Sequence, residues 1–357
     1  MKIPIQNIYY LMTYAWDKLE EAETLNLNLD SYQDAVNLFG RVLVSGCNHI
    51  IKRGLDRSYL STEQDYSGVK GKLNVYESFS RQLFNHGKTN CSFDEFTTNV
   101  LHNRVLKSTL RVLANLSIVD RKIRDEAWQC FHRFRGVDEI EPNLRLFSLI
   151  HLHRNNSYYG LPLNVAKFLL ENIVLDETEG QMKFKNFVRD EKAMAALFED
   201  FIRNFYAREQ NYYKVRREDI KWQVEPLFGS DYSLLPKMQT DITLESASHK
   251  LIIDTKYYSK TTGEYYGSEK LHSTNLYQLH AYLTNIEKDI SNARNSDCDG
   301  MLLYPKISKD YDETYRVGNH TIRVKTIDLS KEWREIETEL LYSVNFYSKH
   351  SLSNLAT

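Results

Sequence analysis

The sequence predicts a mostly helical α+β domain over residues 1–160, followed by an α/β domain over residues 161–357 whose central mixed sheet is flanked by helices. Three observations favour this fold class. The chain has 357 residues, whereas single cores stop growing at about 250–300 residues. The first part carries apolar residues at helical spacing. The second part follows the order helix, strands, helix, strand, which is typical of α/β domains.

The first domain begins with two helices. Residues 5–16 and 34–52 carry apolar residues at helical spacing, and Gly54 is a suitable stop after the second helix. Residues 58–77 predict a loop with a short strand, because glycines precede alternating apolar residues. The remaining elements are helices at 97–117 and 121–134 and a charged loop at 136–160, which ends in HRNNSYYG and separates the domains.

The second domain begins with a helix at residues 163–174 that bridges the two domains in this interpretation. Residues 190–208 predict a strongly amphipathic helix, because Met194, Phe198 and Phe205 share one face. The elements expected next are strands at 222–228, 239–245 and 250–258, a helix at 273–287, a strand at 300–304, a strand pair across 314–329 and a helix at 331–346.

Composition and charge exclude several classes of protein. The hydrophobic content of 42% and charged content of 26% are those of an ordinary globular protein. A formal net charge of −2 excludes the broad basic surface of a protein that binds DNA unaided. The four cysteines form no C-x-x-C pair, which argues against disulfides and structural zinc. No apolar run approaches about 20 residues and the start lacks a signal-peptide cleavage site, so we expect a cytoplasmic protein without membrane contact.

Three polar residues interrupt apolar strands in the second domain. In KLIIDTKYY, the apolar run at 251–253 leads directly into Asp254 and Lys256, which point to one face because side chains alternate along a strand. A carboxylate and an ammonium beside a hydrophobic strand are costly to bury unless they are used. Asp241 interrupts the preceding strand, and SASH at 246–249 predicts a hairpin loop. Antiparallel pairing would bring Asp241 against Asp254.

Two carboxylates that converge at one end of a hairpin form a hard-oxygen site suited to Mg²⁺, or to Mn²⁺. The backbone carbonyl of Thr255 is placed to be the third protein ligand beside Asp241 and Asp254. Such a metal would stabilise charge on a scissile phosphate and lower the pKa of the attacking water, while Lys256 would orient that water or neutralise the phosphorane. The alternative interpretation is an Asp–Lys pair that decorates an edge strand, with Asp241 as a turn residue.

The arrangement of Asp241 and the D-T-K run at 254–256 resembles the core motif of the PD-(D/E)xK nucleases. This resemblance implies that the second domain has the restriction-endonuclease-like fold and that Asp241, Asp254 and Lys256 are the catalytic residues. One position departs from the motif, because Thr240 stands where the superfamily has proline before the first aspartate. Proline is not a ligand at that position, so the departure puts little in doubt.

Two further features extend the resemblance. Gln278-x-x-x-Tyr282 in NLYQLHAY resembles the additional Q-x-x-x-Y motif of the RecB-like branch, which implies that both side chains flank the site. Glu199 lies on the helix at 190–208, where many nucleases of this superfamily place an acidic residue near the metal. The alternative for Glu199 is a solvated helix residue beside the apolar stripe.

Segments over nearly the whole chain resemble the McrC family, the nuclease subunits of McrBC restriction systems that depend on modified cytosine. They are NIYYLMTYAW (7–16), GVKGKL (68–73), NHGKT (85–89), NRVLKSTL (103–110), IRDEA (123–127), TDIT (240–243), NLYQLHAYL (275–283) and LLYP (302–305). The resemblance implies an endonuclease that cleaves double-stranded methylated DNA with McrB, a hexameric AAA+ GTPase. It also implies that the first domain docks in the McrB ring and stimulates GTP hydrolysis, and that complexes dimerise for double-strand cleavage.

One segment looks like part of a nucleotide-binding loop. Gly87-Lys88-Thr89 resembles the end of a Walker A loop, but Gln82 stands where that loop needs glycine. We therefore expect that the chain has no P-loop and binds no nucleotide alone. A nuclease that depends on a separate motor fits this expectation.

Basic residues around the candidate site offer a modest patch for contacts with the DNA backbone, which position a duplex without reading its sequence. The candidates are Lys214, Arg216, Arg217, Tyr257, Lys260 and Lys270, with Tyr212 and Tyr213 beside them. Four residues of the first domain are candidates for contact with the partner, with plain solvent exposure as the alternative: Lys70, Lys72, Arg104 and Lys107.

Two other functions are compatible with the sequence. The chain would be a non-catalytic adaptor that activates a ring NTPase on a nuclease-like scaffold, although the complete Asp/Asp/Lys set counts against this. A nuclease of transposition or repair would instead cut DNA without GTP. The sequence does not identify the modified base, because its recognition would lie in the partner.

Overall fold

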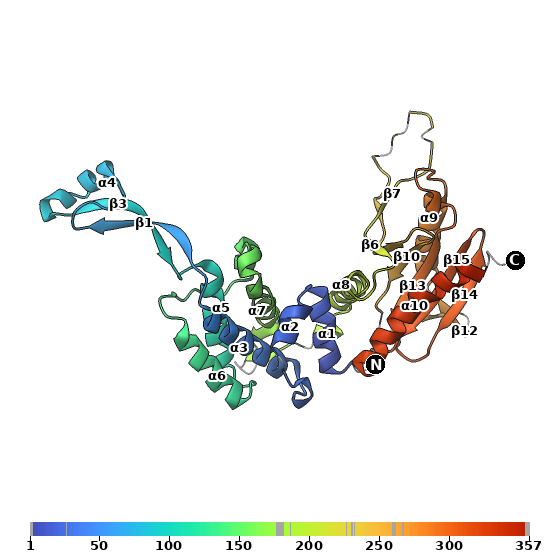
Figure 1. Cartoon of the computed structure of the whole chain (residues 1–357), viewed down its shortest axis with the longest axis horizontal. Helices are drawn as coiled ribbons and strands as arrows, with labels where there is room; N and C mark the ends of the chain where they lie inside the picture. The colour runs from blue at the N-terminus through green and yellow to red at the C-terminus, as the bar shows by residue number, and fades with distance from the viewer. Residues whose placement is uncertain are drawn as a thin grey trace. The chain divides into compact units, whose positions relative to one another are not determined.

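The computed structural model describes residues 3–25, 27–175, 182–185, 187–225, 227–229, 231, 233–258, 262–265 and 268–353 (Figure 1). The chain forms two compact units. Unit 1 comprises Met1–Leu19 and Asn186–Thr357, and unit 2 comprises Glu20–Lys185. Within the described residues, no helix is both long and apolar enough to cross a membrane.

The boundary between the units differs from the predicted one at residue 160. Helix α7 (Gly160–Asn172) belongs to unit 2, because its apolar side is buried against α3 (Ala35–Arg53). The two helices approach closely, since a Cβ atom on Gly46 of α3 would lie 2.5 Å from Cγ of Pro162 on α7. Residues 163–174 therefore do not bridge two domains, and unit 2 extends to Lys185.

The first helix also lies in a different unit from the one expected. Helix α1 (Ile5–Ala15) packs on α8 (Glu191–Glu209) of unit 1, where the ring of Tyr14 contacts Phe201 and Phe205. The side chain of Asn7 donates to the carbonyl of Leu329 over 2.8 Å. These contacts between residues far apart in sequence explain why the N-terminal segment joins the C-terminal unit, which periodicity alone does not reveal.

Unit 2 combines a helical body with a projecting β-arm. The predicted helices over 34–52, 97–117 and 121–134 are confirmed as α3, α5 (Leu101–Asn115) and α6 (Arg121–Arg133). The other elements are α2 (Leu19–Thr24), β4 (Ile173–Leu175), β5 (Met182–Phe184) and short 3₁₀ helices at Leu29–Ser31, Leu83–His86, Leu144–Leu149 and Arg154–Tyr159.

The β-arm spans residues 58–97 and was largely missed by the sequence analysis. Strand β1 (Ser58–Tyr66) pairs antiparallel with β3 (Thr89–Thr97), and β3 also pairs with β2 (Lys72–Leu73), which precedes α4 (Val75–Ser80). Most of the β1 side chains are exposed on both faces, so the strand lacks the alternation of apolar and polar residues that identifies a half-buried strand. The predicted loop over 58–77 is therefore wrong for residues 58–66.

Unit 1 contains a mixed sheet with the strand order β14-β15-β13-β10-β9-β6. Strand β13 is parallel to β10 and β15, and the other pairs are antiparallel. The strands are β6 (Lys214–Arg216), β9 (Ile242–Glu245), β10 (Lys250–Thr255), β13 (Asp299–Pro305), β14 (Asp312–Val317) and β15 (His320–Ile327). The remaining elements are β7 (Asp219–Ile220), β8 (Met238–Gln239), β11 (Thr262–Tyr265), β12 (Ser268–Leu271), α9 (Ser273–Glu287), α10 (Trp333–Ser353) and 3₁₀ helices at Phe187–Arg189 and Ala293–Asn295.

Helices cover both faces of this sheet. On one face, α9 buries Leu279 and Leu283 against Ile252 of β10 and neighbouring strands. Gly300 of β13 permits this close approach, because a Cβ atom there would lie 3.0 Å from both leucine side chains. On the other face, α8 and α10 pack together, and the hydroxyl of Tyr206 donates to the carbonyl of Leu340. The predicted α/β class with a mixed sheet between helices is confirmed.

The predicted strand at 222–228 is wrong. In the structure these residues belong to the loop between β7 and β8, and the edge of the sheet beside β9 is formed by β6. Several of the apolar side chains that suggested a strand are exposed at the end of this loop, so they do not pack on the sheet. The predicted strand at 239–245 is interrupted at Thr240 and Asp241, between β8 and β9.

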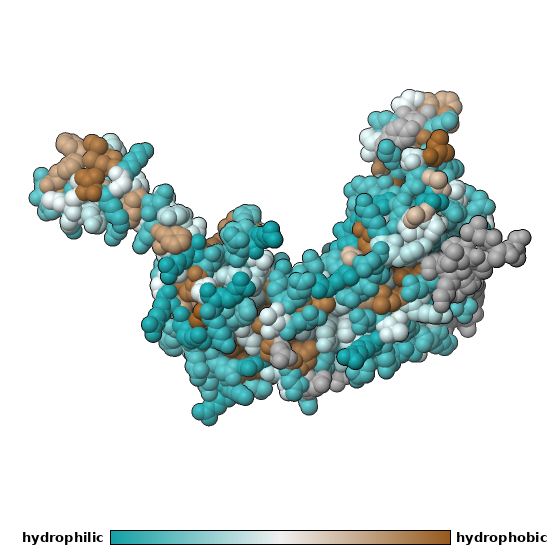
Figure 2. Space-filling model, viewed as in Figure 1, coloured by the Kyte–Doolittle hydropathy of each residue, from teal (hydrophilic) through white to brown (hydrophobic). Residues whose placement is uncertain are grey.

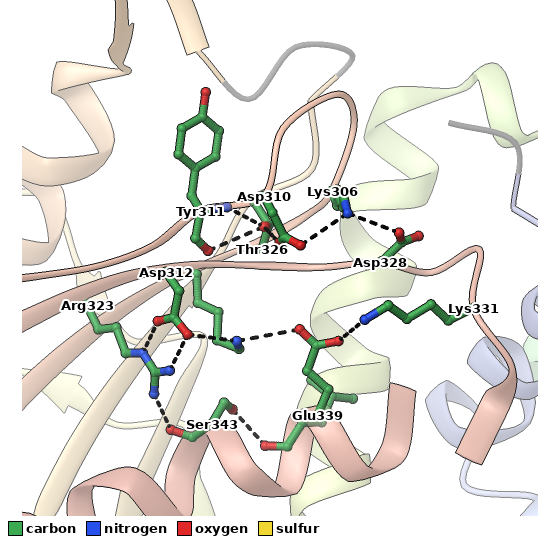
Figure 3. Close-up of polar contacts among 12 residues, drawn as sticks. Lys306, Asp310, Tyr311, Asp312, Arg323, Thr326, Asp328, Lys331, Glu339 and Ser343 are labelled. Atoms are coloured by element: carbon green, nitrogen blue, oxygen red, sulfur yellow. Dashed lines mark hydrogen bonds and ion pairs between the residues drawn. The ribbon is translucent and has the colours of Figure 1, made fainter. Parts of the chain in front are cut away.

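A network of buried and half-buried charges joins α10 to the last two strands (Figure 3). Arg323 of β15 donates from Nε and Nη2 to both carboxylate oxygens of Asp312 on β14. Lys325 pairs with Asp312 and with Glu339 of α10, and Lys331 also binds Glu339 over 2.9 Å. Because each of these charges has an opposite partner, the network accounts for the burial of two basic side chains. It connects α10 to this side of the sheet.

Candidate functional site

The hairpin of β9 and β10 brings Asp241 to the end of β10. Ile242 pairs with Ile253, and the turn at 246–249 is closed by a hydrogen bond from Ser246 N to His249 O. Asp241 therefore lies beside the end of β10, where its Oδ2 accepts hydrogen bonds from the backbone N–H and the hydroxyl of Thr255 over 2.8 Å and 3.1 Å. Thr255 thus fixes the orientation of the Asp241 carboxylate.

Thr240, which replaces the proline of the sequence motif, has its own structural role. It is buried, its backbone N–H donates to the carbonyl of Glu218, and its hydroxyl accepts from the N–H of Glu218 over 2.9 Å. Proline has no N–H and makes no such donor bond. The threonine therefore ties the segment before Asp241 to the segment that follows β6.

Asp254 and Lys256 lie side by side on the same face of the chain. Asp254 has 0% exposure, and its Oδ2 is 2.7 Å from Nζ of Lys256. Its Oδ1 has no hydrogen-bond partner within the described part of the chain. A buried carboxylate oxygen without a partner is costly, and such groups in native proteins call for an explanation such as a bound ion.

The electrostatics of the site follow from burial and from the closeness of several charges. Burial raises the pKa of Asp254 to about 7, the Lys256 ammonium opposes this shift, and the Asp241 and Glu199 carboxylates add to it. Burial lowers the pKa of Lys256, but the Asp254 carboxylate outweighs this effect and raises it above its ordinary value. Lys256 is therefore a cation at neutral pH, beside a carboxyl that ionises with difficulty.

Glu199 lies on α8 and faces the same group of charges. Burial and the Asp241 carboxylate raise the pKa of Glu199, while Arg217 lowers it. Oε1 of Glu199 pairs with Arg217, and with Arg203 over 3.4 Å. Glu199 is thus held by two arginines and lies close enough to Asp241 and Asp254 for the three carboxyl groups to influence one another.

Gln278 and Tyr282 form a hydrogen-bonded pair four residues apart on α9. The side-chain amide of Gln278 donates to the Tyr282 hydroxyl over 2.8 Å, and that hydroxyl donates to the carbonyl of Gln239 over 3.1 Å. Gln239 precedes Asp241 by two residues. Burial raises the pKa of Tyr282, the hydrogen bond from Gln278 lowers it, and the Asp254 carboxylate raises it. Because Asp254 influences this pKa, the tyrosine is close to the site. The pair connects α9 to the end of β8, two residues before the first aspartate.

The residues present fit a hard divalent cation. Asp241 and Asp254 supply carboxylate oxygens, one oxygen of Asp254 is buried without a hydrogen-bond partner, and oxygen donors are those that Mg²⁺ prefers. Among the described residues, no group of three or more histidine, cysteine, aspartate or glutamate side chains is arranged to hold a metal. A metal at this position would therefore take two carboxylates, with further oxygens from backbone and water.

The structure places only some of the proposed DNA contacts where they are available. Arg216 is engaged with Glu245, and Arg217 with Glu199. Tyr257 packs edge-on against Phe198, and Lys214 is exposed on β6. Of the remaining candidates, Tyr213 is buried against His249, Tyr212 bonds Ser248, Lys260 lies outside the described residues, and Lys270 lies in β12 with its side chain outside them.

The four candidates for partner contact are divided between two parts of unit 2. Lys70 and Lys72 are exposed on the β-arm, where Nζ of Lys70 lies 3.8 Å from the centroid of the Phe93 ring. Lys107 is engaged within the helical body, since its Nζ donates to the carbonyl of Val137 over 2.6 Å. Arg104 is half-buried on α5.

The sequence analysis missed a set of exposed apolar side chains on the β-arm. Tyr76 and Phe79 on α4 are 84% and 76% exposed, and Val69, Val75 and Phe84 are also exposed. Figure 2 shows the corresponding apolar residues as brown and tan areas at the end of the arm. The short run VYESFS does not by itself indicate a binding site. It does so once the run is known to lie on a projecting arm, because exposed apolar clusters mark interaction sites.

Comparison with known proteins gives consistent results. Residues 7–305 match the family model of the McrBC 5-methylcytosine restriction system component. The type IV methyl-directed restriction enzyme EcoKMcrBC of Escherichia coli (strain K12) is 33% identical over 347 residues, which are 97% of this chain and 99% of that protein. A chain from the half-complex of Thermococcus gammatolerans McrB AAA+ hexamers with bound McrC matches in fold, with a TM-score of 0.57 and 15% identity over 96% of this chain and 76% of that chain.

Proposed function

Because the chain belongs to the family of McrBC 5-methylcytosine restriction system components, we propose that it is the endonuclease subunit of such a system and that unit 1 is a PD-(D/E)xK nuclease. One observation carries this proposal. Asp254 is completely buried with an unpartnered oxygen, next to the Lys256 ammonium and beside Asp241. Burial of these charged groups destabilises the fold. A role in phosphodiester hydrolysis would explain why the chain has them.

Asp241 and Asp254 would hold Mg²⁺, with the Thr255 carbonyl as a third protein ligand. When bound, Mg²⁺ supplies a positive charge that stabilises the developing charge on the scissile phosphate and lowers the pKa of a water. Thr255 orients Asp241 through two hydrogen bonds, and Tyr282 fixes the backbone two residues before it. Lys256 places its ammonium beside Asp254, where it orients the attacking water or neutralises charge on the phosphate.

The remaining residues of the site have supporting roles. Arg203 and Arg217 hold Glu199 near Asp241 by ion pairs. We therefore assign the metal ligands to Asp241 and Asp254 and not to Glu199. Gln278 orients the Tyr282 hydroxyl by donating to it. None of these side chains provides the strong grip on DNA that a stand-alone nuclease needs, and the net charge of −2 is consistent with this.

The proposed partner is a separate AAA+ GTPase of the McrB type. The Thermococcus gammatolerans protein with the same fold is found with McrB AAA+ hexamers, which supports this assignment. The β-arm of unit 2, with its exposed apolar side chains, is the proposed contact with the ring. In this account, the partner recognises methylated DNA and hydrolyses GTP, and this chain stimulates the hydrolysis and cuts.

The direct test is cleavage by purified components. The chain, its AAA+ partner, methylated duplex DNA, GTP and Mg²⁺ should together produce double-strand breaks, and omission of GTP or of the methyl groups should prevent them. Cleavage that is equally fast without GTP would favour a nuclease of repair or transposition. Absence of cleavage, together with full stimulation of the GTPase, would favour the adaptor function.

A further inference from the structure

The loop between β7 and β8 is firmly anchored at its base. The two strands pair antiparallel, and the indole N–H of Trp222 donates across the loop to the carbonyl of Pro236 over 2.7 Å. The backbone N–H of Gln223 donates to the side chain of Asn285 on α9, and Trp222 packs against the hydrophobic core. Figure 1 shows the loop projecting away from the sheet beyond β7. Its base is therefore held by α9.

Apolar side chains are exposed at the end of this loop. Phe228 is fully exposed, Leu234 is 93% exposed, and Leu227 is also exposed. Phe228 has a φ of 54°, in the left-handed region, which is unusual for a bulky residue. The exposed ring and the strained backbone both carry a cost, and such features cluster at ligand-binding sites. Figure 2 shows brown and tan residues at this end of unit 1.

The base of the loop lies directly beside the candidate catalytic site. After β8 the chain reaches Asp241 in two residues, and α9, which anchors Gln223, also carries Gln278 and Tyr282. Phe228 follows Ile220 by eight positions, so at about 3.3 Å per residue the tip reaches at most about 26 Å from the end of β7. The tip can therefore contact DNA only within about 26 Å of the end of β7.

The form of the tip favours DNA over a protein as its partner. A stable protein interface buries roughly 800 Å² on each side, whereas this tip presents only a few protruding side chains. Proteins that kink DNA insert such single apolar side chains between base steps. The loop carries Lys221 and Lys237 but also Glu225 and Asp231, so its charge is balanced and does not favour contact with phosphates.

We propose that the β7–β8 loop is an apolar wedge that enters the DNA duplex beside the cut site, with Phe228 as the residue that unstacks a base step. This inference rests on the proposed nuclease function of unit 1. A reach of about 26 Å corresponds to about eight base pairs at 3.4 Å each, which sets the region where the wedge acts. The wedge would hold a bent duplex against the site while the partner moves along it.

The experiment uses the full chain in complex with its AAA+ partner and a methylated duplex that carries 2-aminopurine, one position at a time, on both sides of the cut. The complex carries the Asp254→Ala substitution, so that the DNA stays intact. 2-Aminopurine becomes brighter when it loses its stacked neighbours. We expect a several-fold rise in emission at one or two adjacent positions within about eight base pairs of the cut.

The variant Phe228→Asn removes the ring but keeps a residue that tolerates the left-handed backbone. In the complex it should abolish the rise in emission, and with Asp254 intact it should slow cleavage roughly tenfold, without a change in melting temperature. Leu234→Ala is a second variant at the tip, and Tyr315→Ala, an exposed tyrosine on β14, is the matched control.

An unchanged emission profile in both tip variants would overturn the wedge while leaving the nuclease function intact. Loss of partner binding or of GTPase stimulation in Phe228→Asn would also overturn it, because the tip would then serve a protein contact. Failure of the nuclease function itself is recognised separately. In that case the unmodified complex cuts no DNA, whatever residue stands at position 228.

Discussion

Asp254 is the second-last residue of β10, a strand in which every residue is buried, and it carries the main electrostatic cost of the site. Its carboxyl has no solvent exposure, one of its oxygens has no hydrogen-bond partner among the described residues, and its pKa is raised to about 7. Lys256 compensates one side of the carboxylate only. A bound cation would compensate the other side, which links the stability of unit 1 to metal binding.

This link gives a prediction for Asp254→Asn. Because burial raises the pKa from 3.8 to about 7, ionisation costs stability increasingly as the pH rises through this range, and the full cost applies at pH 8. Without metal at pH 8, the neutral amide should therefore stabilise the protein by on the order of 1 kcal/mol, or about 2–4 °C. Mg²⁺ should raise the melting temperature of the unsubstituted protein but not of the variant. Thermal unfolding with and without Mg²⁺ measures both effects.

The control for this experiment is Glu313→Gln, which changes an exposed carboxylate on β14. It should leave both the melting temperature and its response to Mg²⁺ unchanged. An equal Mg²⁺ response in Asp254→Asn and in the unsubstituted protein would show that the metal binds elsewhere.

At the residue scale, the sequence predicted that Asp241, Asp254 and Lys256 lie close together, but not their hydrogen bonds. The alternation of side chains in a strand placed Asp254 and Lys256 on one face, and the SASH turn set Asp241 beside the end of β10. The tie from Tyr282 to the Gln239 carbonyl and the arginines around Glu199 depend on contacts between distant segments. Such contacts leave no periodic signal in a single sequence.

At the scale of elements, the β-arm is the clearest departure from an ordinary globular fold. Strand β1 is largely exposed on both faces, and α4 presents Tyr76 and Phe79 to solvent. Exposed aromatic side chains on a small projecting element serve as anchors at protein interfaces. The arm therefore has the features expected of the contact with the GTPase ring.

Replacement of these two aromatic residues tests the role of the arm. In Tyr76→Ser/Phe79→Ser, stimulation of the partner's GTPase should fall by about thirtyfold or more, because truncation of an aromatic anchor typically costs about 2 kcal/mol or more. The melting temperature should stay the same, since both side chains are exposed. GTP hydrolysis is measured against concentration of the chain, with Tyr342→Ser, an exposed tyrosine on α10, as the control. Unaltered stimulation in the double variant would exclude the arm as the contact.

The sequence predicted long amphipathic elements well and irregular elements poorly. Because they pack on a core, the helices α3, α5, α6, α8 and α9 carry strong periodic patterns, and the strands β10 and β13 carry continuous apolar runs. The β-arm and the β7–β8 loop project into solvent, so their apolar residues follow no period that reflects burial. The prediction of a strand at 222–228 was wrong because its apolar residues were interpreted as buried, whereas several of them are exposed on the loop.

At the scale of the whole molecule, the proposed function divides two tasks between the two units. Unit 2 carries the β-arm, and unit 1 carries the site of Asp241, Asp254 and Lys256. The sequence predicted two domains but placed their boundary at residue 160, because it could not show that α1 packs on α8. The proposed function therefore predicts that DNA cleavage and the activation of the partner's GTPase can be impaired independently.

The most direct measurement compares cleavage with GTP hydrolysis in Asp254→Ala, assembled with the AAA+ partner on methylated DNA in Mg²⁺ and GTP. Cleavage should fall by at least about a thousandfold, because charge stabilisation by a bound metal is worth several kcal/mol. Stimulation of GTP hydrolysis should stay at the level of the unsubstituted chain and of the Glu313→Ala control. Full cleavage by Asp254→Ala would contradict the assignment of the nuclease site.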